Sequence, residues 1–545
     1  MKKKIISALL AAVMVFSLTA CGGGSDKKSA DGTYYNTYLD TDPTTMDPVK
    51  GNDTYSMGIL RNIMEPLTRL EEDGDKQERK GAGAESWESN DDGTVWTFHL
   101  RDNKWSDGEP VTADDYVYGM KQTLDPEAGS PNAFYITCIK NGEAIYNGEK
   151  DVSELGVKAV DDKTLEITLE YSVPYFLSLT DTRAMYPVRE DLVEKYGESY
   201  GANVESMVGC GPFKMTSWKR NSKIELEKNE NYWDKDSVKL DKVNYQIVSD
   251  QTARFNSFDS GSLDYVACAD KEWIGRFDKK DKVDVVEAPI PTVRYDFFNC
   301  QDKIFSNVNI RKAFTMAVNR EDMCSVIYND IHKPLYGWVP YSTSTGELGE
   351  YRDQVEEPLK SITEDPKELL LKGMQELGLG SDPSTLSITY TLSGTTEWTR
   401  NYAAYCQQMW EKILGVKVEL DFNEWGTFQS KTNNGEFQIA MMTCSIDYDD
   451  PMAMMEVFAG GSNMVPVFWQ NEQYDSLVAQ ARKEMDEKTR VDLYKQAENI
   501  LLAEDCVISP NVNECTHSYY YQYVKNYNKL ASSTSGLKYV DTSAR

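Results

Sequence analysis

The segment CSIDYDDPM, residues 444–452, places three carboxylates within four positions: Asp447, Asp449 and Asp450. Carboxylates this close repel one another and raise each other's pKa. They could bind a cationic group through charge-assisted hydrogen bonds, or they could form a solvated turn, because Asp and Pro are common turn residues. The preceding QIAMMT, residues 438–443, is mostly apolar and predicts a buried strand that ends where the acids begin.

Other arrangements typical of catalysis or metal binding are weak in this sequence. A calcium loop of the EF-hand type starting at Asp447 would need Gly and Glu where the chain has Met452 and Phe458. The fragment GCGP, residues 209–212, begins like a dinucleotide loop, but Lys214 replaces the third glycine. The three histidines lie far apart, and no H-E-x-x-H, G-x-S-x-G or Walker A motif is present. We therefore expect a protein that is not an enzyme, with no metal and no cofactor.

The N-terminus has the pattern of an export signal. Three lysines precede the apolar run IISALLAAVMVFSL, which is too short for a transmembrane helix. The small-residue site LTAC then ends at Cys21 and resembles a bacterial lipobox. We predict a signal peptide at residues 1–20, lipidation of Cys21, and a Gly/Ser-rich flexible tether over residues 21–33. An ordinary secretory signal that contains a cysteine is the alternative.

The charge of the chain limits its partners. The formal net charge is −30. Removal of residues 1–20 takes away three lysines and no acid, which gives −33 for the mature chain. Such a charge opposes binding to nucleic acid and to an anionic membrane surface, and it is compatible with cationic ligands. We expect contact with the membrane only through the N-terminal lipid, on the extracellular face of the cell membrane.

Nine cysteines follow Cys21, an odd number that cannot all pair within one chain. No two of them form a C-x-x-C pair, which opposes a zinc ribbon or a thioredoxin-like site. We interpret most of them as small buried hydrophobic residues.

Recurring strand–helix units indicate an α/β protein. Residues 95–124 read as a strand, a turn and a helix with Thr112 as its N-cap. Residues 242–266 and 386–422 each read as strand, helix and strand, and residues 365–376 read as a helix that Asp365 caps. At this length, such units predict at least two separately cored domains.

Four blocks of the sequence resemble the oligopeptide/dipeptide-binding lipoproteins of ABC importers. Two of them are WTFHLRDNKWSDGEPVTADDYVYGMKQTLDP (96–126) and VGCGPFKMTSWKRNSKIELEKNENYWD (208–234). The third is YDFFNCQDKIFSNVNIRKAFTMAVNRE (295–321), and the fourth is IDYDDPM with the region downstream of it. The blocks occur in the order typical of the family and span residues 34–540.

The resemblance implies a bilobal, periplasmic-binding-protein-like type II fold with an extra inserted domain. Lobe I is then built from three separate segments, and lobe II precedes the last of them. The ligand lies between the two lobes, which close by a hinge. The implied boundaries are 34–70, 205–290 and 512–545 for lobe I, 71–204 for the inserted domain, and 291–511 for lobe II.

The resemblance also implies the site residues. In peptide-binding relatives the first Asp of the DY-x-x-P motif pairs with the α-ammonium of the ligand, and Asp447 holds that position here. Tyr448 and Asp450 belong to the same motif, and a tryptophan matching Trp425 lines a side-chain pocket. The remaining positions implied to lie at the cleft are Cys210 and Gly211 of the GxGP turn, Tyr55 and Ser56, and Asn132 and Phe134. The alternatives are a core tryptophan for Trp425 and, for the GxGP turn, a tight turn that requires glycine φ values.

Two departures from the enteric oligopeptide binder concern the carboxylate end of a peptide. Met441 and Cys444 stand where that protein has an arginine and a tryptophan. We therefore predict a lipid-anchored, monomeric solute-binding subunit for oligopeptides, whose partners are ABC permease subunits and their ATPases. An oligosaccharide-binding protein of the same fold is one alternative. An exported hydrolase is another, since any two of the 88 acids could form a catalytic pair.

Overall fold

The computed structural model describes residues 32–73, 76–446, 448–460, 464–527 and 536–545. The predicted signal peptide, Cys21, most of the predicted tether and Asp447 lie outside the described residues. The chain divides after Gly32, and everything below concerns Thr33–Arg545.

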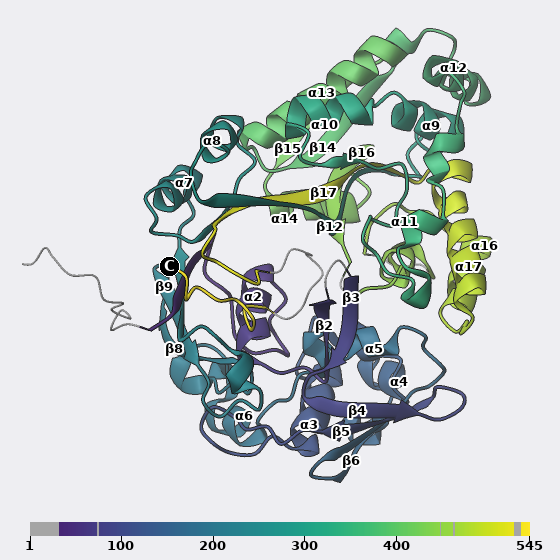
Figure 1. Cartoon of the computed structure of the whole chain (residues 1–545). Coiled ribbons are helices and arrows are strands. Elements are labelled where there is room, and N and C mark those ends of the chain that lie inside the picture. Colours follow the sequence, from purple (N-terminus) through teal and green to yellow (C-terminus); the bar gives the residue numbers. More distant parts are fainter. Residues whose placement is uncertain (1–31, 74–75, 447, 461–463, 528–535) are drawn as a thin grey trace, which may run out of the picture. The chain divides into compact units, whose positions relative to one another are not determined.

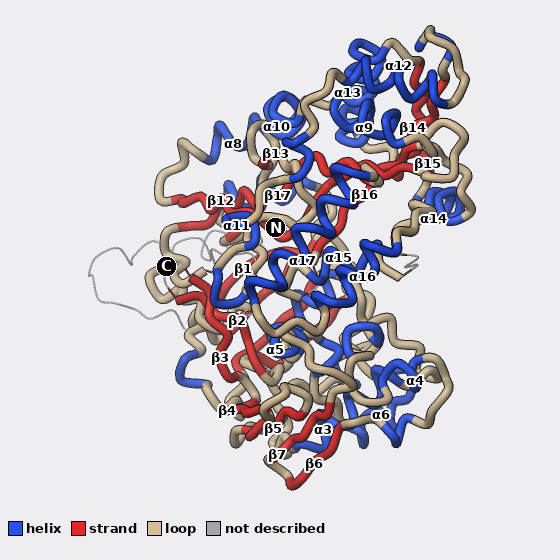
Figure 2. The backbone as a smooth tube through the Cα atoms, turned by 90° about the vertical axis from the view of Figure 1, so that its right-hand side faces the viewer, coloured by secondary structure: helices blue, strands red, loops and turns tan. Residues whose placement is uncertain are grey.

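The strands of this unit form four sheets (Figures 1 and 2). One four-stranded sheet has the order β1 (Tyr34–Leu39), β10 (Lys242–Ile247), β9 (Lys223–Lys228) and β8 (Phe213–Lys219). A second, fully antiparallel sheet has the order β4 (Ala84–Ser89), β5 (Val95–Leu100), β7 (Thr164–Thr168) and β6 (Val157–Asp161). A hairpin joins β2 (Thr68–Asp73) and β3 (Lys76–Gly81).

The fourth sheet has seven strands. Its order is β11 (Tyr265–Ala267), β17 (Ile508–Tyr521), β12 (Val283–Phe298), β16 (Ile439–Ser445), β14 (Ser387–Ser393) and β15 (Lys417–Asn423), with β13 (Lys333–Pro334) paired to β17. The helices α9, α10, α12 and α13 gather on one side of this sheet (Figure 1).

The longer helices are α2 (Thr54–Ile63), α3 (Ala113–Leu124), α7 (Gln251–Asp259), α9 (Val308–Met316), α10 (Arg320–Tyr328), α12 (Pro366–Glu376), α13 (Glu397–Leu414), α14 (Trp425–Asn433), α16 (Glu472–Ala481) and α17 (Glu487–Asn499). The shorter ones are α4 (Gly142–Tyr146), α5 (Phe176–Leu179), α6 (Glu190–Tyr196), α8 (Lys271–Phe277), α11 (Tyr351–Gln354) and α15 (Met452–Met455), together with the 3₁₀ turns η1 (Ala133–Ile136) and η3 (Arg183–Met185). None of the described helices is both long and apolar enough to cross a membrane.

The predicted elements are confirmed together with their end signals. Thr112 and Asp115 form a capping box at the start of α3, and Asp365 accepts hydrogen bonds from two backbone N–H groups at the start of α12. The helix α13 ends at Gly415, whose φ of 79° is left-handed. One grouping differs from the sequence analysis: β10 and β11, which flank α7, belong to different sheets.

The strands β12 and β17 are the longest in the described chain, and their ladder crosses the predicted boundaries at 290/291 and 511/512. Their register shifts between Pro289 and Val293. Asn513 bridges this irregularity, since its Nδ2 donates to the Ile290 carbonyl at 2.9 Å and its Oδ1 accepts from the Tyr341 N–H at 2.7 Å.

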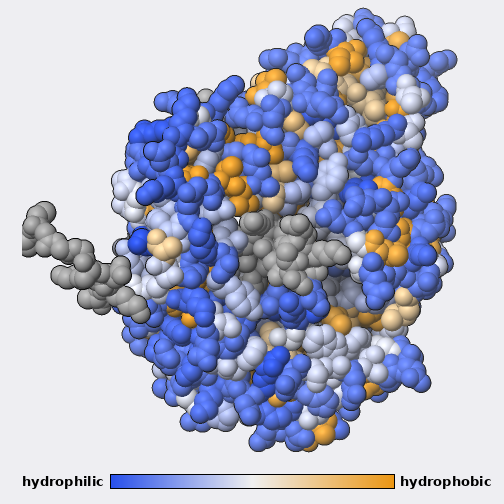
Figure 3. Space-filling model, viewed as in Figure 1, coloured by the Kyte–Doolittle hydropathy of each residue, from blue (hydrophilic) through white to orange (hydrophobic). Residues whose placement is uncertain are grey.

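Most of the buried apolar side chains form one large cluster, and a smaller cluster lies between α7, α8, β11 and β17. The nine cysteines of Thr33–Arg545 are free thiols; seven are buried, and Cys300 and Cys444 are half-buried. This confirms the interpretation of most of them as small core residues. The face seen in Figure 3 is mainly hydrophilic, as the charge of the chain predicts.

Candidate functional site

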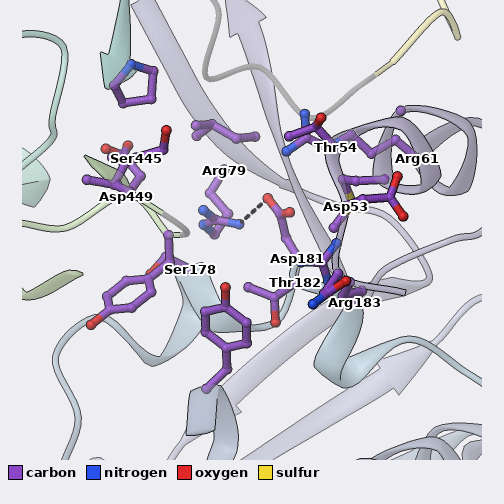
Figure 4. Close-up of a pocket in the computed structure, with 18 residues that line it drawn as sticks. Asp53, Thr54, Arg61, Arg79, Ser178, Asp181, Thr182, Arg183, Ser445 and Asp449 are labelled. Carbon is purple, nitrogen blue, oxygen red and sulfur yellow. Dashed lines mark hydrogen bonds and ion pairs between the residues drawn. The ribbon is translucent and has the colours of Figure 1, made fainter. Parts of the chain in front are cut away.

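A cavity of about 320 Å³ collects charged and polar side chains from segments far apart in the sequence (Figure 4). The start of α2, the β2–β3 hairpin, η1 and the segment 178–183 form one part of its wall. Pro291 of β12, the end of β16 and the loop after it form the other. The lining residues are Asn52, Asp53, Thr54, Met57, Gly58, Arg61, Leu70, Arg79, Tyr135, Ser178, Asp181, Thr182, Arg183, Pro291, Ser445, Ile446, Tyr448 and Asp449.

The acidic loop enters the cavity because β16 ends beside β12. The strand runs to Ser445, and the Ile446 N–H donates to the Pro291 carbonyl at 3.0 Å. Two residues of the loop, Tyr448 and Asp449, then line the cavity. Asp447 lies between these two segments but outside the described residues, so its predicted role as ligand anchor stays a prediction.

Asp449 faces the cavity, and a backbone N–H group holds its carboxylate in place. Its Oδ1 accepts a hydrogen bond from the Ser344 N–H at 2.8 Å. Burial raises the pKa of Asp449 to about 6, although the Ser344 N–H and the positive charge of Arg79 act in the opposite direction. At neutral pH this side chain is therefore mostly a carboxylate, and it gains a proton on mild acidification.

Asp450 points away from the cavity into the protein. It forms an ion pair with Arg490 at 3.2 Å, accepts a hydrogen bond from the Tyr494 hydroxyl at 2.8 Å, and accepts one from the Met452 N–H at 2.9 Å. Burial raises its pKa and the Arg490 charge lowers it, with a net upward shift. These contacts fix the loop, so Asp450 supports the cavity wall without lining it.

Tyr448 connects the loop to Tyr175, which lies near the lining segment 178–183 in the sequence. Its ring stacks on that of Tyr175, with 5.1 Å between ring centroids and 15° between the planes. Its hydroxyl donates to Glu456 at 2.8 Å. A predicted site residue thus lines the cavity and also joins the predicted lobe II to the predicted inserted domain.

An ion pair spans the middle of the cavity. Arg79 of β3 lies 3.1 Å from Asp181, and both side chains are largely covered. Arg79 also donates to the Thr68 hydroxyl at 3.0 Å. Figure 4 shows Asp449 on one side of this pair, and Asp53, Arg61 and Arg183 on the other. The cavity therefore carries both signs of charge along its length.

Asn132 is buried below the cavity wall. Its Nδ2 donates to the carbonyls of Pro48, Val49 and Gly51 at 3.0–3.3 Å. Its Oδ1 accepts from Arg183 Nε at 2.9 Å. The structure thus places this predicted contact residue beneath the wall, where it orients Arg183. Phe134 is 40% exposed, packs against Tyr135 and does not itself line the cavity.

Ser56 and Tyr55 lie in the first turn of α2. Ser56 is buried, and its N–H and hydroxyl both donate to Asp53, the N-cap residue. Tyr55 is half-buried beside the core and is absent from the cavity wall, although its neighbours Asp53 and Thr54 belong to that wall.

The GxGP turn packs against the end of α2. A Cβ on Gly209 would lie 2.1 Å from the Ile63 carbonyl oxygen, and one on Gly211 would lie 2.5 Å from that of Met64. Neither glycine has a left-handed φ, so close approach of two backbones explains them, and the φ explanation is wrong. Cys210 is buried, and neither it nor Gly211 lines the cavity.

Trp425 opens α14 and stacks on Phe428, with 5.6 Å between centroids. It is 51% exposed and does not line the cavity, so the core interpretation of this tryptophan is wrong.

The sequence analysis missed the four charged residues opposite the acidic loop: Arg61, Arg79, Asp181 and Arg183. The nearest signal was the N-cap pattern at Asp53, which predicts the start of α2 and thus places Arg61 two turns further along the helix. The other three carry no local motif.

Comparison with known proteins identifies the family of this chain. The model for bacterial extracellular solute-binding proteins, family 5 Middle, matches residues 78–465. The chain belongs to this family.

Two curated relatives cover nearly the whole chain. It is 36% identical over 518 residues to the dipeptide-binding protein DppE of Bacillus subtilis, covering 93% of each chain. It is 35% identical over 526 residues to the oligopeptide-binding protein OppA of the same organism, covering 92% of this chain and 93% of that one. Both relatives are named as binding proteins.

A solved structure supports the same assignment. The substrate-binding domain of an oligopeptide ABC transporter from Bacillus anthracis matches with a TM-score of 0.78 and 30% identity, covering 94% of this chain and 99% of that one. The predicted fold class is confirmed: this family member has the periplasmic-binding-protein-like type II fold. The residue boundaries of its lobes and inserted domain stay a prediction.

Proposed function

We propose that this family 5 protein is the lipid-anchored, extracellular solute-binding subunit of an ABC importer for peptides. In this proposal a peptide is captured between the two lobes and delivered to the permease subunits, which two ATPases drive. The protein acts as a monomer and carries out no chemistry on its ligand.

One observation carries the proposal: the acidic loop of the DY-x-x-P motif lines a cavity in a chain whose extensive relatives are named for dipeptides and oligopeptides. Every unmodified peptide offers an α-ammonium group, whatever its side chains. A carboxylate in a partly enclosed cavity forms a charge-assisted hydrogen bond with such a group. We assign this contact to Asp447, with Asp449 beside it adding to the negative potential.

Titration calorimetry with peptides of two to six residues tests the proposal directly. We expect saturable binding of at least one length, and loss of binding when the α-amino group is acetylated. Equal binding of the free and acetylated peptides would contradict recognition of the ammonium group. Native mass spectrometry of protein purified from its host would show which ligand copurifies.

The two alternatives predict different results. An oligosaccharide binder would respond to glycans and show no dependence on an ammonium group. A hydrolase would return cleaved products when the protein is incubated with peptide and glycan mixtures and analysed by mass spectrometry. We expect every ligand to be recovered intact.

A further inference from the structure

Three arginines line the cavity, and they differ in their partners. Arg79 is neutralised by Asp181 at 3.1 Å. Arg61 and Arg183 form no ion pair with any described residue. Asp53, which lies on the same side as Arg61 and Arg183, accepts from the Ser56 N–H, the Ser56 hydroxyl and the Thr44 hydroxyl at 2.6–2.8 Å. Within the described part of the chain, two guanidinium groups therefore line the cavity without forming an ion pair.

The side chain of Arg183 is held in a fixed orientation. Its Nε donates to Asn132 Oδ1 at 2.9 Å, and Asn132, which is 1% exposed, is fixed in turn by three backbone carbonyls. The two terminal nitrogens of Arg183 make no hydrogen bond to a described residue. A buried amide thus orients the guanidinium and leaves its outer N–H groups for a ligand, an arrangement that lowers the entropy cost of binding.

Arg61 and Arg183 line the same cavity. Arg61 is in the last turn of α2, and Figure 4 shows both arginines on the same side of the Arg79–Asp181 pair, opposite Asp449. The buried Tyr186 hydroxyl lies within electrostatic reach of both. Burial raises the pKa of Tyr186, and each of the two guanidiniums lowers it.

The whole chain is strongly acidic, with a formal charge of −30, yet among the described residues this end of the cavity holds two guanidinium groups and a single carboxylate, Asp53, whose oxygens are engaged by Ser56 and Thr44. Partly buried cations of this kind are unfavourable unless an anion joins them. The planar guanidinium matches a carboxylate with two parallel hydrogen bonds. Met441, at the position where the enteric oligopeptide binder has an arginine, does not line the cavity; Arg61 and Arg183 are the lining arginines that form no ion pair with a described residue.

We propose that Arg61 and Arg183 together bind a carboxylate of the peptide ligand, either its free C-terminus or an acidic side chain. This inference rests on the proposed function, since it assumes a peptide in the cavity. It makes the ligand class more specific: a peptide with a cationic group at the Asp449 end and a carboxylate at the Arg61–Arg183 end.

The test uses three peptides: Ala-Glu-Ala, Ala-Gln-Ala and Ala-Gln-Ala amide. Titration calorimetry measures their affinities for the full-length wild-type protein after copurified ligand has been removed. We expect a loss of about tenfold or more at the step that removes the recognised carboxylate. A loss from the first peptide to the second identifies the side chain, and a loss from the second to the third identifies the C-terminus.

The Arg61→Gln/Arg183→Gln variant, tested with the same peptides, completes a double-mutant cycle between the protein and the peptide. It should bind Ala-Glu-Ala about tenfold more weakly than the wild type and should not distinguish the carboxylate from its neutral replacement. Arg400→Gln, which changes an exposed arginine of α13, is the matched control and should bind like the wild type. Cooperative thermal unfolding of each variant separates a binding defect from a folding defect.

Two outcomes overturn the inference in different ways. If all three peptides bind the wild type equally well, peptides are ligands but the two arginines do not recognise a carboxylate. If none of the three peptides binds, and no other peptide of two to six residues binds, the proposed function fails and this inference fails with it.

Discussion

Asp450 and Arg490 form an ion pair at 3.2 Å in which the two side chains are only 4% and 5% exposed. The pair lies one residue away from Asp449, which faces the cavity. The two acids therefore have different roles: Asp450 fixes the loop to α17, and Asp449 places its charge at the cavity. These two roles account for the adjacent acids Asp449 and Asp450 after β16.

Replacing Asp450 should destabilise the fold. Asp450→Asn leaves Arg490 as a buried cation without a counter-charge, and loss of one partner of a buried pair typically costs about 3–5 kcal/mol. Urea denaturation should show this loss in the free energy of unfolding. Asp492→Asn changes an exposed acid of the same helix and serves as the control. A stability equal to that of the control would contradict the role assigned to the pair.

Replacing Asp447 should weaken binding and leave folding intact. Asp447→Asn removes the charge proposed to meet the α-ammonium, and we expect at least a tenfold loss of affinity, about 1.4 kcal/mol. Acetylating the peptide removes the same contact from the other side, so the two changes should not add. Asp449→Asn should cost less. Additive losses in calorimetry would mean that Asp447 and the ammonium group do not interact.

Protonation of Asp296 should stabilise the fold on mild acidification, whereas His332, whose pKa is lowered by burial, acts in the opposite direction over the same pH range. Burial raises the pKa of Asp296 to about 6, although hydrogen bonds from Tyr390, Asn511 and Tyr402 act against it. Since the ordinary value is about 3.9, the folded state binds the proton first, and this protonation stabilises the fold as the pH falls from 7 to 5. The gain is about 1 kcal/mol from this group, and Asp449 should add a similar amount.

Chemical denaturation at pH 7 and pH 5, without ligand, measures this gain. Relative to the wild type, Asp296→Asn should lower the stability at pH 5 minus that at pH 7 by about 1 kcal/mol, whereas the exposed-residue control Asp91→Asn should leave this difference unchanged. The same slope in all three proteins would show that the buried carboxyl does not titrate in this range.

Adding a methyl group to the GxGP turn should disrupt packing. In Gly211→Ala the new Cβ would lie 2.5 Å from the Met64 carbonyl oxygen, and overpacking of this kind typically costs about 1–3 kcal/mol. The helical Gly275, whose Cβ would meet nothing within 4 Å, provides the control Gly275→Ala. A melting temperature that falls equally in both variants would exclude the close approach as the reason for the glycine.

Changing Cys21 should release the protein from the membrane. Cys21→Ala removes the thiol that the lipobox pattern predicts to be acylated, so the variant should partition into the aqueous phase of a detergent extract or remain an uncleaved precursor. Cys300→Ala, at a half-buried thiol of the described unit, should partition like the wild type. Normal processing and unchanged partitioning of Cys21→Ala would refute the lipid anchor.

Local elements were predictable because their signals are local. Asp365 and Thr112 cap helices whose first turns lie beside them in the sequence. The assignment of β10 and β11 to different sheets was not predictable, because each pairs with strands far away along the chain.

The site was predictable only in part, for a related reason. Asn132 and Ser56 have the same side chains whether they bond a ligand or a backbone, and the structure shows that here they bond the protein itself. Arg61 and Arg183 carry no motif, since 27% of the chain is charged and nothing nearby distinguishes two arginines 122 positions apart. The folded chain brings α2 and the segment 178–183 to one cavity.

The long ladder of β12 and β17, which is irregular at two places, limits how the parts that it joins can move. Two hydrogen-bonded strands cannot slide past each other without breaking many backbone bonds, so we expect bending of this connection to concentrate at its irregularities, between Pro289 and Val293 and between Arg294 and Tyr295. A disordered linker would leave many relative orientations of the two joined parts. Each binding event would then have to overcome the entropy lost when those parts become ordered. With two paired strands as the connection, the entropy of ordering it is lost once, when the chain folds. This cost is not repeated each time a ligand binds.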